Sequence, residues 1–188
     1  MSQIVSGRKV TLEELKQLGT NSKEALLATA QLVGRDIMAY LHWSAGHYHQ
    51  IYDDYHIGID DDGSIYVTTD DLSAVLVHTW HRNTGAIGIS LACGAFSNAK
   101  DLGAEPPTDC QIESMARVIA VLSEALNVPI NADRVMTHAE AANLDDYGPN
   151  TTWERWDLWF LKNGDAMGTG GETIRGKALW YQQNGVGA

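Results

Sequence analysis

The chain has few of the residues that several specialised architectures need. Its only two cysteines among 188 residues, Cys93 and Cys110, allow at most one disulfide and cannot supply the four thiolates of an all-cysteine zinc site. Thirteen lysines and arginines stand against 24 aspartates and glutamates, which gives a formal net charge of −11. This acidity argues against a phosphate-binding surface for nucleic acid and against attachment to an anionic membrane.

Long apolar runs are also absent from the sequence. No stretch approaches the roughly 18 uninterrupted apolar residues of a membrane span. The N-terminal MSQIVSGRKVTLEELKQ contains basic residues but no apolar run after them. We therefore expect synthesis in the cytoplasm without a secretory signal peptide. The apolar fraction of 44% and the charged fraction of 20% are typical of a globular domain with its own core.

The first 35 residues have the pattern of a helical extension. Thr11 and Glu14 are spaced as a capping box, and Asn21 to Glu24 repeat that spacing ahead of the apolar-faced ALLATAQLV. Gly19 and Gly34 follow the two segments. The sequence predicts two helices in residues 1–35, packed on the main domain.

A strand pattern begins at residue 37. Residues 37–43 and 86–94 are short apolar runs typical of buried strands, and residues 55–69 have the pattern of a hairpin with a type I′ turn at Asp62-Gly63. A long helix is predicted after Thr108, followed by a strand at 134–138, and residues 153–161 are aromatic enough to begin a docked helix. We expect an α/β fold with a mixed central sheet flanked by helices. The Gly-rich residues 163–188 are expected to form a partly mobile tail in which ALWY packs back.

Two histidines follow predicted strands in a way that suits a metal. Catalytic zinc takes three protein ligands and keeps a fourth position open. His42 ends one predicted strand and His138 closes another, so the two imidazoles can converge on one ion. Asp157, between Trp156 and Leu158, is a charge in an apolar setting that needs a partner. A strand-end histidine is also common as a hydrogen-bonded core residue, so the spacing leaves both interpretations open.

Five motifs in a fixed order carry a family resemblance: LHWSAG, YHIGIDDDGSIY, HTWHRNTGAIGIS, VMTHAE and RWDLW. Over roughly residues 36–162 the chain resembles the zinc-dependent N-acetylmuramoyl-L-alanine amidases, which share a fold with peptidoglycan recognition proteins and short phage endolysins. The resemblance implies one Zn²⁺ held by His42, His138 and Asp157. Asp145 and Asp146 are alternative third ligands, but the RWD triplet matches the K/R-x-D pattern of the family.

The resemblance also implies roles for other residues. Tyr55 would activate or orient the water, and Arg155, which stays charged at neutral pH, would steady the oxyanion. Ser90 stands where the cytoplasmic recycling branch has a glutamate base. Glu140 would hold a ligand imidazole in its tautomer. The expected substrate-binding residues are His56, His78, Asn83 and Trp43. Neither cysteine matches a ligand position, and both are expected to be buried thiols.

These observations predict a monomeric enzyme that hydrolyses the amide between N-acetylmuramic acid and L-alanine in peptidoglycan. The resemblance to the phage branch implies an endolysin that accumulates in the cytoplasm and reaches the cell wall when a holin opens the membrane. Three alternatives remain open at this point: a cytoplasmic amidase that recycles muropeptides, a non-catalytic peptidoglycan-binding module, and an antibacterial effector delivered to a neighbouring cell.

Overall fold

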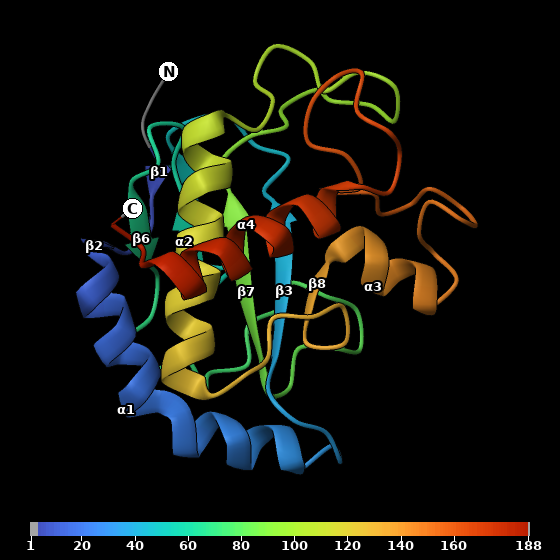
Figure 1. Ribbon diagram of the computed structural model, residues 1–188. Coiled ribbons are helices and arrows are strands. Elements are labelled where there is room, and N and C mark those ends of the chain that lie inside the picture. The colour runs from blue at the N-terminus through green and yellow to red at the C-terminus, as the bar shows by residue number, and fades with distance from the viewer. Residues whose placement is uncertain (1–3, 188) are drawn as a thin grey trace.

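A mixed β-sheet forms the centre of the computed structural model, which describes residues 4–187 (Figure 1). Six strands lie in the order β2-β6-β5-β7-β3-β8. Their bounds are β2 Arg8–Val10, β3 Met38–Trp43, β5 Ile57–Ile59, β6 Ile65–Val67, β7 Ala86–Leu91 and β8 Val135–Thr137. Strands β5, β7, β3 and β8 are parallel to one another, whereas β6 pairs antiparallel with both of its neighbours, β5 and β2. The short strands β1 Ile4–Val5 and β4 Gln50–Ile51 form a separate parallel pair. The predicted α/β fold with a mixed sheet is confirmed.

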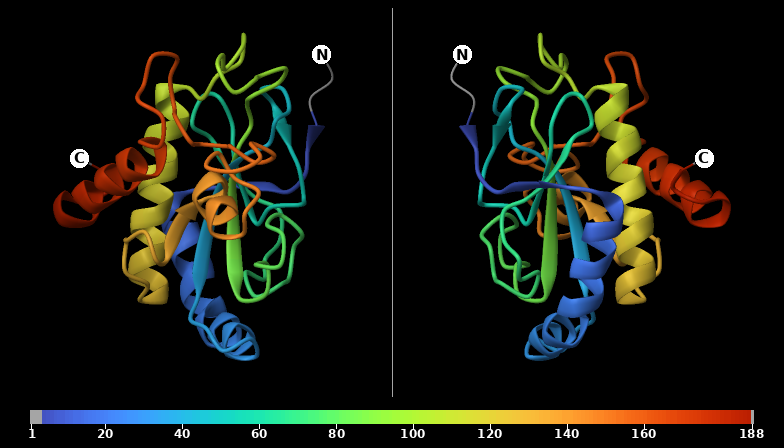
Figure 2. Two further views of the ribbon diagram at one scale, coloured as in Figure 1. Left: turned by 90° about the vertical axis from the view of Figure 1, so that its right-hand side faces the viewer. Right: turned by 90° about the vertical axis from the view of Figure 1, so that its left-hand side faces the viewer.

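Four helices accompany the sheet in the described residues: α1 Leu12–Gln31, α2 Asp109–Leu126, α3 His138–Leu144 and α4 Gly170–Asn184. Helix α2 contacts β5 and β7, and α1 and α4 both pack against α2. Figure 2 shows α2 and α4 on one side of the sheet and the connection between β6 and β7 on the other. Strands β3 and β7 are almost wholly buried because both of their faces are covered. None of the helices in residues 4–187 combines the length and apolar character needed to span a membrane.

The N-terminal extension differs from the prediction in two respects. Residues 12–31 form one continuous helix, so the second capping signal at Asn21 does not start a new one. Gly19 faces α2, where a Cβ would lie 3.1 Å from the Cβ of Ala125, so this glycine permits close helix packing instead of ending the helix. The extension also adds strand β2 to the edge of the central sheet. The predicted capping box of Thr11 and Glu14 is confirmed.

The predicted hairpin is confirmed, but its turn type is not. Strands β5 and β6 pair antiparallel, and Gly63 has a φ of 84°. Asp62 does not have a positive φ, which a type I′ turn requires at both central residues. The amide of Gly63 donates to the carbonyl of Asp60, and the amide of Asp60 donates to the carbonyl of Ser64. A five-residue loop therefore replaces the two-residue turn.

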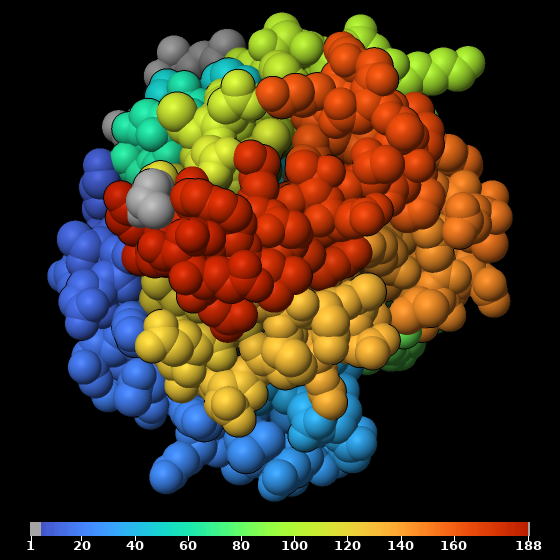
Figure 3. Space-filling model, in the orientation of Figure 1, coloured from blue at the N-terminus to red at the C-terminus, as the bar shows by residue number. Residues whose placement is uncertain are grey.

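The C-terminal residues correct the expectation of a mobile tail. Helix α4 packs on α2 and buries Ile174, Ala178 and Tyr181, and Figure 3 shows it (red) across the middle of one face of the molecule. Gly168, Gly170 and Gly171 permit close packing: a Cβ on Gly170 would lie 2.0 Å from the carbonyl oxygen of Leu158. A glycine-rich sequence is typical of flexible chain, and only the packing shows why these glycines are present.

Two smaller predictions also fail. Residues 153–161 form turns and bends instead of a helix, and the positive φ values of Trp153 (60°) and Leu158 (59°) are incompatible with a helix there. Cys93 is a buried free thiol as expected, but Cys110 is exposed near the start of α2.

Candidate active site

The two predicted histidines lie at adjacent strand ends. His42 is the penultimate residue of β3, and His138 begins α3 directly after β8. Because Leu41 pairs with Thr137 in parallel register, the next residue of each strand brings the two imidazoles together, with ring centroids 4.7 Å apart. Asp157 reaches the same point from the loop after α3. The sequence thus places both histidines correctly, although His138 opens a helix instead of closing a strand.

The three side chains form a compact group of donors. His42 Nδ1 lies 3.1 Å from Asp157 Oδ2, and His138 Nδ1 lies 3.2 Å from Asp157 Oδ1. The ligand atoms all lie within 4.8 Å of one another. The residues are 1%, 7% and 5% exposed for His42, His138 and Asp157, respectively. The group could therefore hold one metal ion beneath the surface.

The chemistry of this donor group fits zinc. Tetrahedral zinc with bonds of about 2.0–2.1 Å places its ligand atoms about 3.3 Å apart, close to the observed separations. Burial, together with the charge of His138, lowers the pKa of His42 to about 4 against the opposing effect of Asp157, so the imidazole is neutral as a ligand must be. Burial acts to raise the pKa of Asp157, but His138 and His42 lower it well below its usual range. A buried carboxylate beside a neutral imidazole has no counter-charge, and this favours the binding of a cation.

The remaining ring nitrogens have partners that fix the imidazoles. His42 Nε2 lies 3.2 Å from His78 Nδ1 and 3.3 Å from Thr79 Oγ1, and His138 Nε2 lies 3.4 Å from the hydroxyl of Tyr147. If each Nδ1 faces the metal, each Nε2 carries the proton and donates to these partners. The family resemblance implies this supporting role for Glu140 and gives none to Thr79. The only sequence signal for Thr79 is its place beside His78 in the HTWHRN motif.

Glu140 has a different position from the expected one. Its carboxylate accepts a hydrogen bond from the Thr137 amide (2.8 Å) and forms a bidentate ion pair with Arg175 (2.8 Å for both contacts). The prediction that it hydrogen-bonds a ligand imidazole is therefore wrong. Its partners instead place it at the N-terminus of the helix that carries His138, where it completes a capping box with Thr137.

The donor group opens into a cleft of about 570 Å³. Tyr55 and Arg155 line this cleft as expected, and the Tyr55 ring lies 5.1 Å from the His42 ring. Burial, followed by the negative charges of Asp157 and Asp54, raises the pKa of the Tyr55 phenol, so it keeps its proton at neutral pH. The Arg155 guanidinium is half exposed and donates to the carbonyl of Glu154 (3.0 Å). Both groups can donate hydrogen bonds to a molecule in the cleft.

Two expected substrate-binding residues do not line the cleft. His56 is fully buried, its Nε2 bonded to the Ala74 carbonyl (2.8 Å) and its Nδ1 accepting from the Gly88 amide (3.1 Å). The Asn83 side chain accepts from the amides of His78 (3.1 Å) and Thr79 (2.7 Å), which shapes their loop. Both side chains hydrogen-bond within the fold and neither lines the cleft, so the substrate contacts of His56 and Asn83 stay predictions.

The other two expected substrate-binding residues do border the cleft. His78 is buried in its wall, where burial and the neighbouring histidines lower its pKa to about 2, and its Nδ1 faces His42. Trp43 is 6% exposed and packs edge-to-face on Trp156 with ring centroids 4.7 Å apart. Only a small part of either side chain can meet a ligand.

The alternative third ligands lie outside the donor group. Asp145 forms an ion pair with Arg82, with contacts of 2.6 and 2.7 Å. Asp146 is not among the side chains that converge with His42 and His138. Asp157 is therefore the carboxylate that completes the group.

A second group of possible metal ligands, His49 with Asp60 and Asp61, lies at the surface. The hydrogen bond and charge of Asp60 raise the pKa of His49. The imidazole lies 3.1 Å from Asp60 and 3.3 Å from Asp61, where its protonated form offsets part of the carboxylate charge. An ion pair accounts for this group without a metal.

The fold and the site define a class of protein: an α/β domain with two imidazoles at the carboxyl ends of parallel strands and one carboxylate from a loop, open to a polar cleft. A comparison with protein-family profiles matches residues 20–153 to N-acetylmuramoyl-L-alanine amidase. The chain belongs to the N-acetylmuramoyl-L-alanine amidase family, whose members are amidases of peptidoglycan. Asp157 and α4 lie beyond the matched residues.

Among solved structures, the chain is similar to the endolysin N-acetylmuramoyl-L-alanine amidase LysCS from Clostridium intestinale URNW. The two chains are 20% identical, with a TM-score of 0.43, over 62% of this chain and 78% of that one. No curated protein matches the chain.

Proposed function

We propose that the protein is a zinc-dependent amidase that hydrolyses the bond between the lactyl group of N-acetylmuramic acid and L-alanine. The observation that carries this proposal is the buried group of His42, His138 and Asp157 at the cleft, with donor atoms at separations suited to zinc. Family membership supports the choice of bond. Loss of a ligand would favour a non-catalytic binding module, but all three ligands converge here.

The residues of the cleft have complementary roles in this reaction. Zinc, when bound, would polarise the scissile carbonyl and lower the pKa of a water molecule. The protonated Tyr55 phenol donates a hydrogen bond toward the reacting oxygen. Arg155 keeps its positive charge throughout the reaction and stabilises negative charge that develops on the carbonyl. His78, Thr79 and Tyr147 hold the two ligand imidazoles in one tautomer.

Metal removal tests this proposal directly. We expect dialysis against a chelator to abolish release of stem peptides from peptidoglycan, and added Zn²⁺ to restore it. The fold should survive metal removal, because the core lies between the sheet and α2 and does not depend on the site. Circular dichroism checks the fold, and elemental analysis checks the metal content. Full activity in metal-free protein would contradict a zinc mechanism.

The residue at position 90 bears on whether the substrate is polymeric cell wall or free muropeptides. Ser90 pairs with His42 in the sheet register, so a glutamate base of the kind found in the recycling branch would lie beside the metal ligand. Here the position holds a buried serine. This supports action on polymeric cell wall, and we propose that the protein serves as a monomeric phage or prophage endolysin released by a holin. Cytoplasmic recycling of free muropeptides is the alternative.

A comparison of two substrates separates these roles. We expect intact sacculi to be solubilised at a higher kcat/KM, per cleavable bond, than soluble muropeptides of the same stem peptide. The replacement Ser90→Glu, which restores the carboxylate of the recycling branch, serves as a companion variant and should not improve turnover of sacculi. Faster hydrolysis of soluble muropeptides by the natural chain would favour the recycling role.

A further inference from the structure

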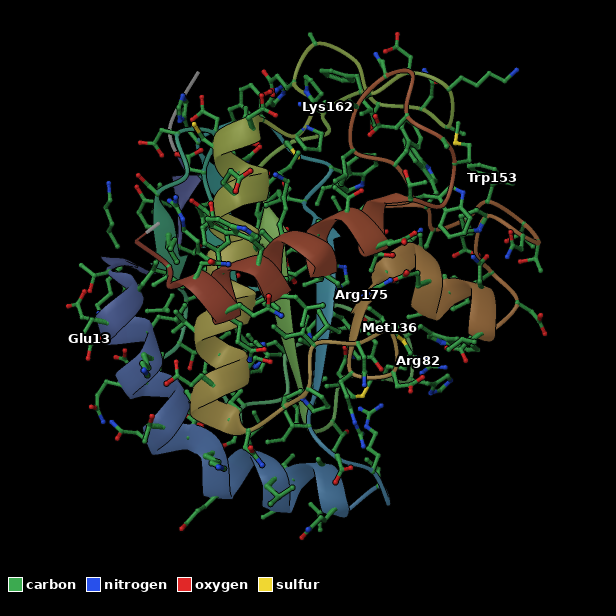
Figure 4. The ribbon with its side chains drawn as sticks, viewed as in Figure 1. Glu13, Arg82, Met136, Trp153, Lys162 and Arg175 are labelled. Carbon is green, nitrogen blue, oxygen red and sulfur yellow. The ribbon has the colours of Figure 1, made fainter. Side chains whose placement is uncertain are left out.

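Helix α4 makes direct contacts with the chain on both sides of His138. The Arg175 side chain, 12% exposed, donates through Nη1 to the carbonyl of Val135 on β8 (3.0 Å). The same guanidinium forms the bidentate ion pair with Glu140 on α3. Figure 4 labels Arg175 where α4 passes the strands β3 and β8. One side chain thus links the strand before the metal ligand to the helix that begins with it.

The Glu140 carboxylate connects Arg175 to the backbone around His138. It accepts from the Thr137 amide (2.8 Å), while Thr137 Oγ1 accepts from the Glu140 amide (3.1 Å). This capping box fixes the backbone immediately before and after His138. Loss of Arg175 would leave a partly buried carboxylate without its counter-charge, and the carboxylate would turn toward solvent. His138 would then lose part of the support that orients its ring.

The start of α4 holds the segment that carries the third ligand. The amides of Gly168 (2.9 Å) and Gly170 (3.2 Å) both donate to the carbonyl of Trp159, two residues after Asp157. Gly171 packs against Glu140, where a Cβ would lie 2.4 Å from the carboxylate. The helix therefore contacts the supports of two of the three ligands.

We propose that Arg175 is a positioning residue of the metal centre, and that through it α4 sets the affinity for zinc. The inference rests on the zinc site of the proposed function. It extends that function to a helix beyond the residues that match the family profile. Supporting groups of this kind change metal affinity about 10–100-fold when they are removed.

The test is the zinc Kd of the full chain, measured by competition with a chromophoric chelator. The variant is Arg175→Gln, and the matched control is Lys177→Gln. Lys177 lies on the same helix and pairs with Glu113 of α2, so its loss weakens the docking of α4 without affecting the contact with α3. We expect Arg175→Gln to weaken zinc binding about 10–100-fold. Lys177→Gln should stay within about twofold, and Arg175→Lys, which keeps the charge, should recover part of the loss.

A double-mutant cycle with Glu140→Gln distinguishes the specific link from general loosening. If Arg175 acts through Glu140, the two losses should not add: the double variant should lose no more zinc affinity than whichever single variant binds zinc more weakly. An unchanged Kd in Arg175→Gln, or an equal loss in Lys177→Gln, overturns the proposal. If Arg175→Gln does not fold, Arg175→Lys and Glu140→Gln carry the same comparison. His42→Ala in the same titration tests the zinc site itself, so failure of the site and failure of the Arg175 role are distinguishable.

Discussion

His42→Ala is expected to abolish both zinc retention and peptidoglycan hydrolysis while leaving the protein folded. The imidazole supplies one of three protein ligands, and structural zinc sites with four ligands bind with about 10–16 kcal/mol. A quarter of that value, about 3 kcal/mol, corresponds to a loss of roughly 100-fold or more in zinc affinity. The fold should persist because His42 lies beside the open cleft and is not part of the apolar core.

Three measurements on the His42→Ala protein check this expectation: bound zinc by elemental analysis, hydrolysis of sacculi and the thermal unfolding transition. His47→Ala is a suitable control, since His47 is only partly buried and pairs with Glu105, outside the donor group. The control should keep its metal and its activity. A His42→Ala protein that hydrolyses sacculi at the natural rate without metal would end the metalloenzyme proposal.

Asp157→Asn should reduce zinc affinity by a similar factor of roughly 100 or more, because an amide oxygen lacks the charge that binds a divalent cation. The matched control is Asp145→Asn, since Asp145 was the alternative third ligand in the sequence. Asp145→Asn breaks the ion pair with Arg82 and should leave the zinc Kd unchanged.

Asp157→Asn is also expected to leave the metal-free protein folded. Asparagine has nearly the shape of aspartate and leaves no buried charge without a partner, so the protein should stay folded, with a lower thermal stability because the imidazoles favour the carboxylate. Zinc titration and thermal unfolding in chelator measure the two effects separately. If Asp145→Asn lost the metal and Asp157→Asn kept it, the assignment of the third ligand would be reversed.

The sequence was sufficient to locate the central strands, α2 and the two histidines of the candidate metal site. These features depend on neighbouring residues: apolar runs define buried strands, a Thr-x-x-Gln box begins α2, and the histidines follow their strands directly. The motif order then assigned Asp157, although its loop has no regular structure. The strands and helix α2 are thus encoded within a few residues along the chain, whereas Asp157 was implied by the family resemblance.

The motifs did not reveal the hydrogen-bond partners of several polar side chains. His56, Asn83 and Glu140 are all reasonable site residues by motif, but the structure pairs them with Gly88, with the loop amides of residues 78–79 and with Arg175. Thr79 and Tyr147, which contact the ligand imidazoles, lie on separate loops that meet only in the fold. A hydrogen-bonding group has several possible partners, and sequence spacing does not choose between them.

The sequence by itself determined the class of sheet, because hydrophobic periodicity is a local property of the chain. The order of its motifs, through the family resemblance, implied the two imidazoles and the acidic residue that lie together. Only the tertiary structure decided that the first helix is continuous, that the glycine-rich C-terminus is a docked helix and that Arg175 pairs with Glu140. Those features arise from close contacts between segments far apart in sequence. A glycine that allows such contact has the same local signature as a glycine in a flexible tail.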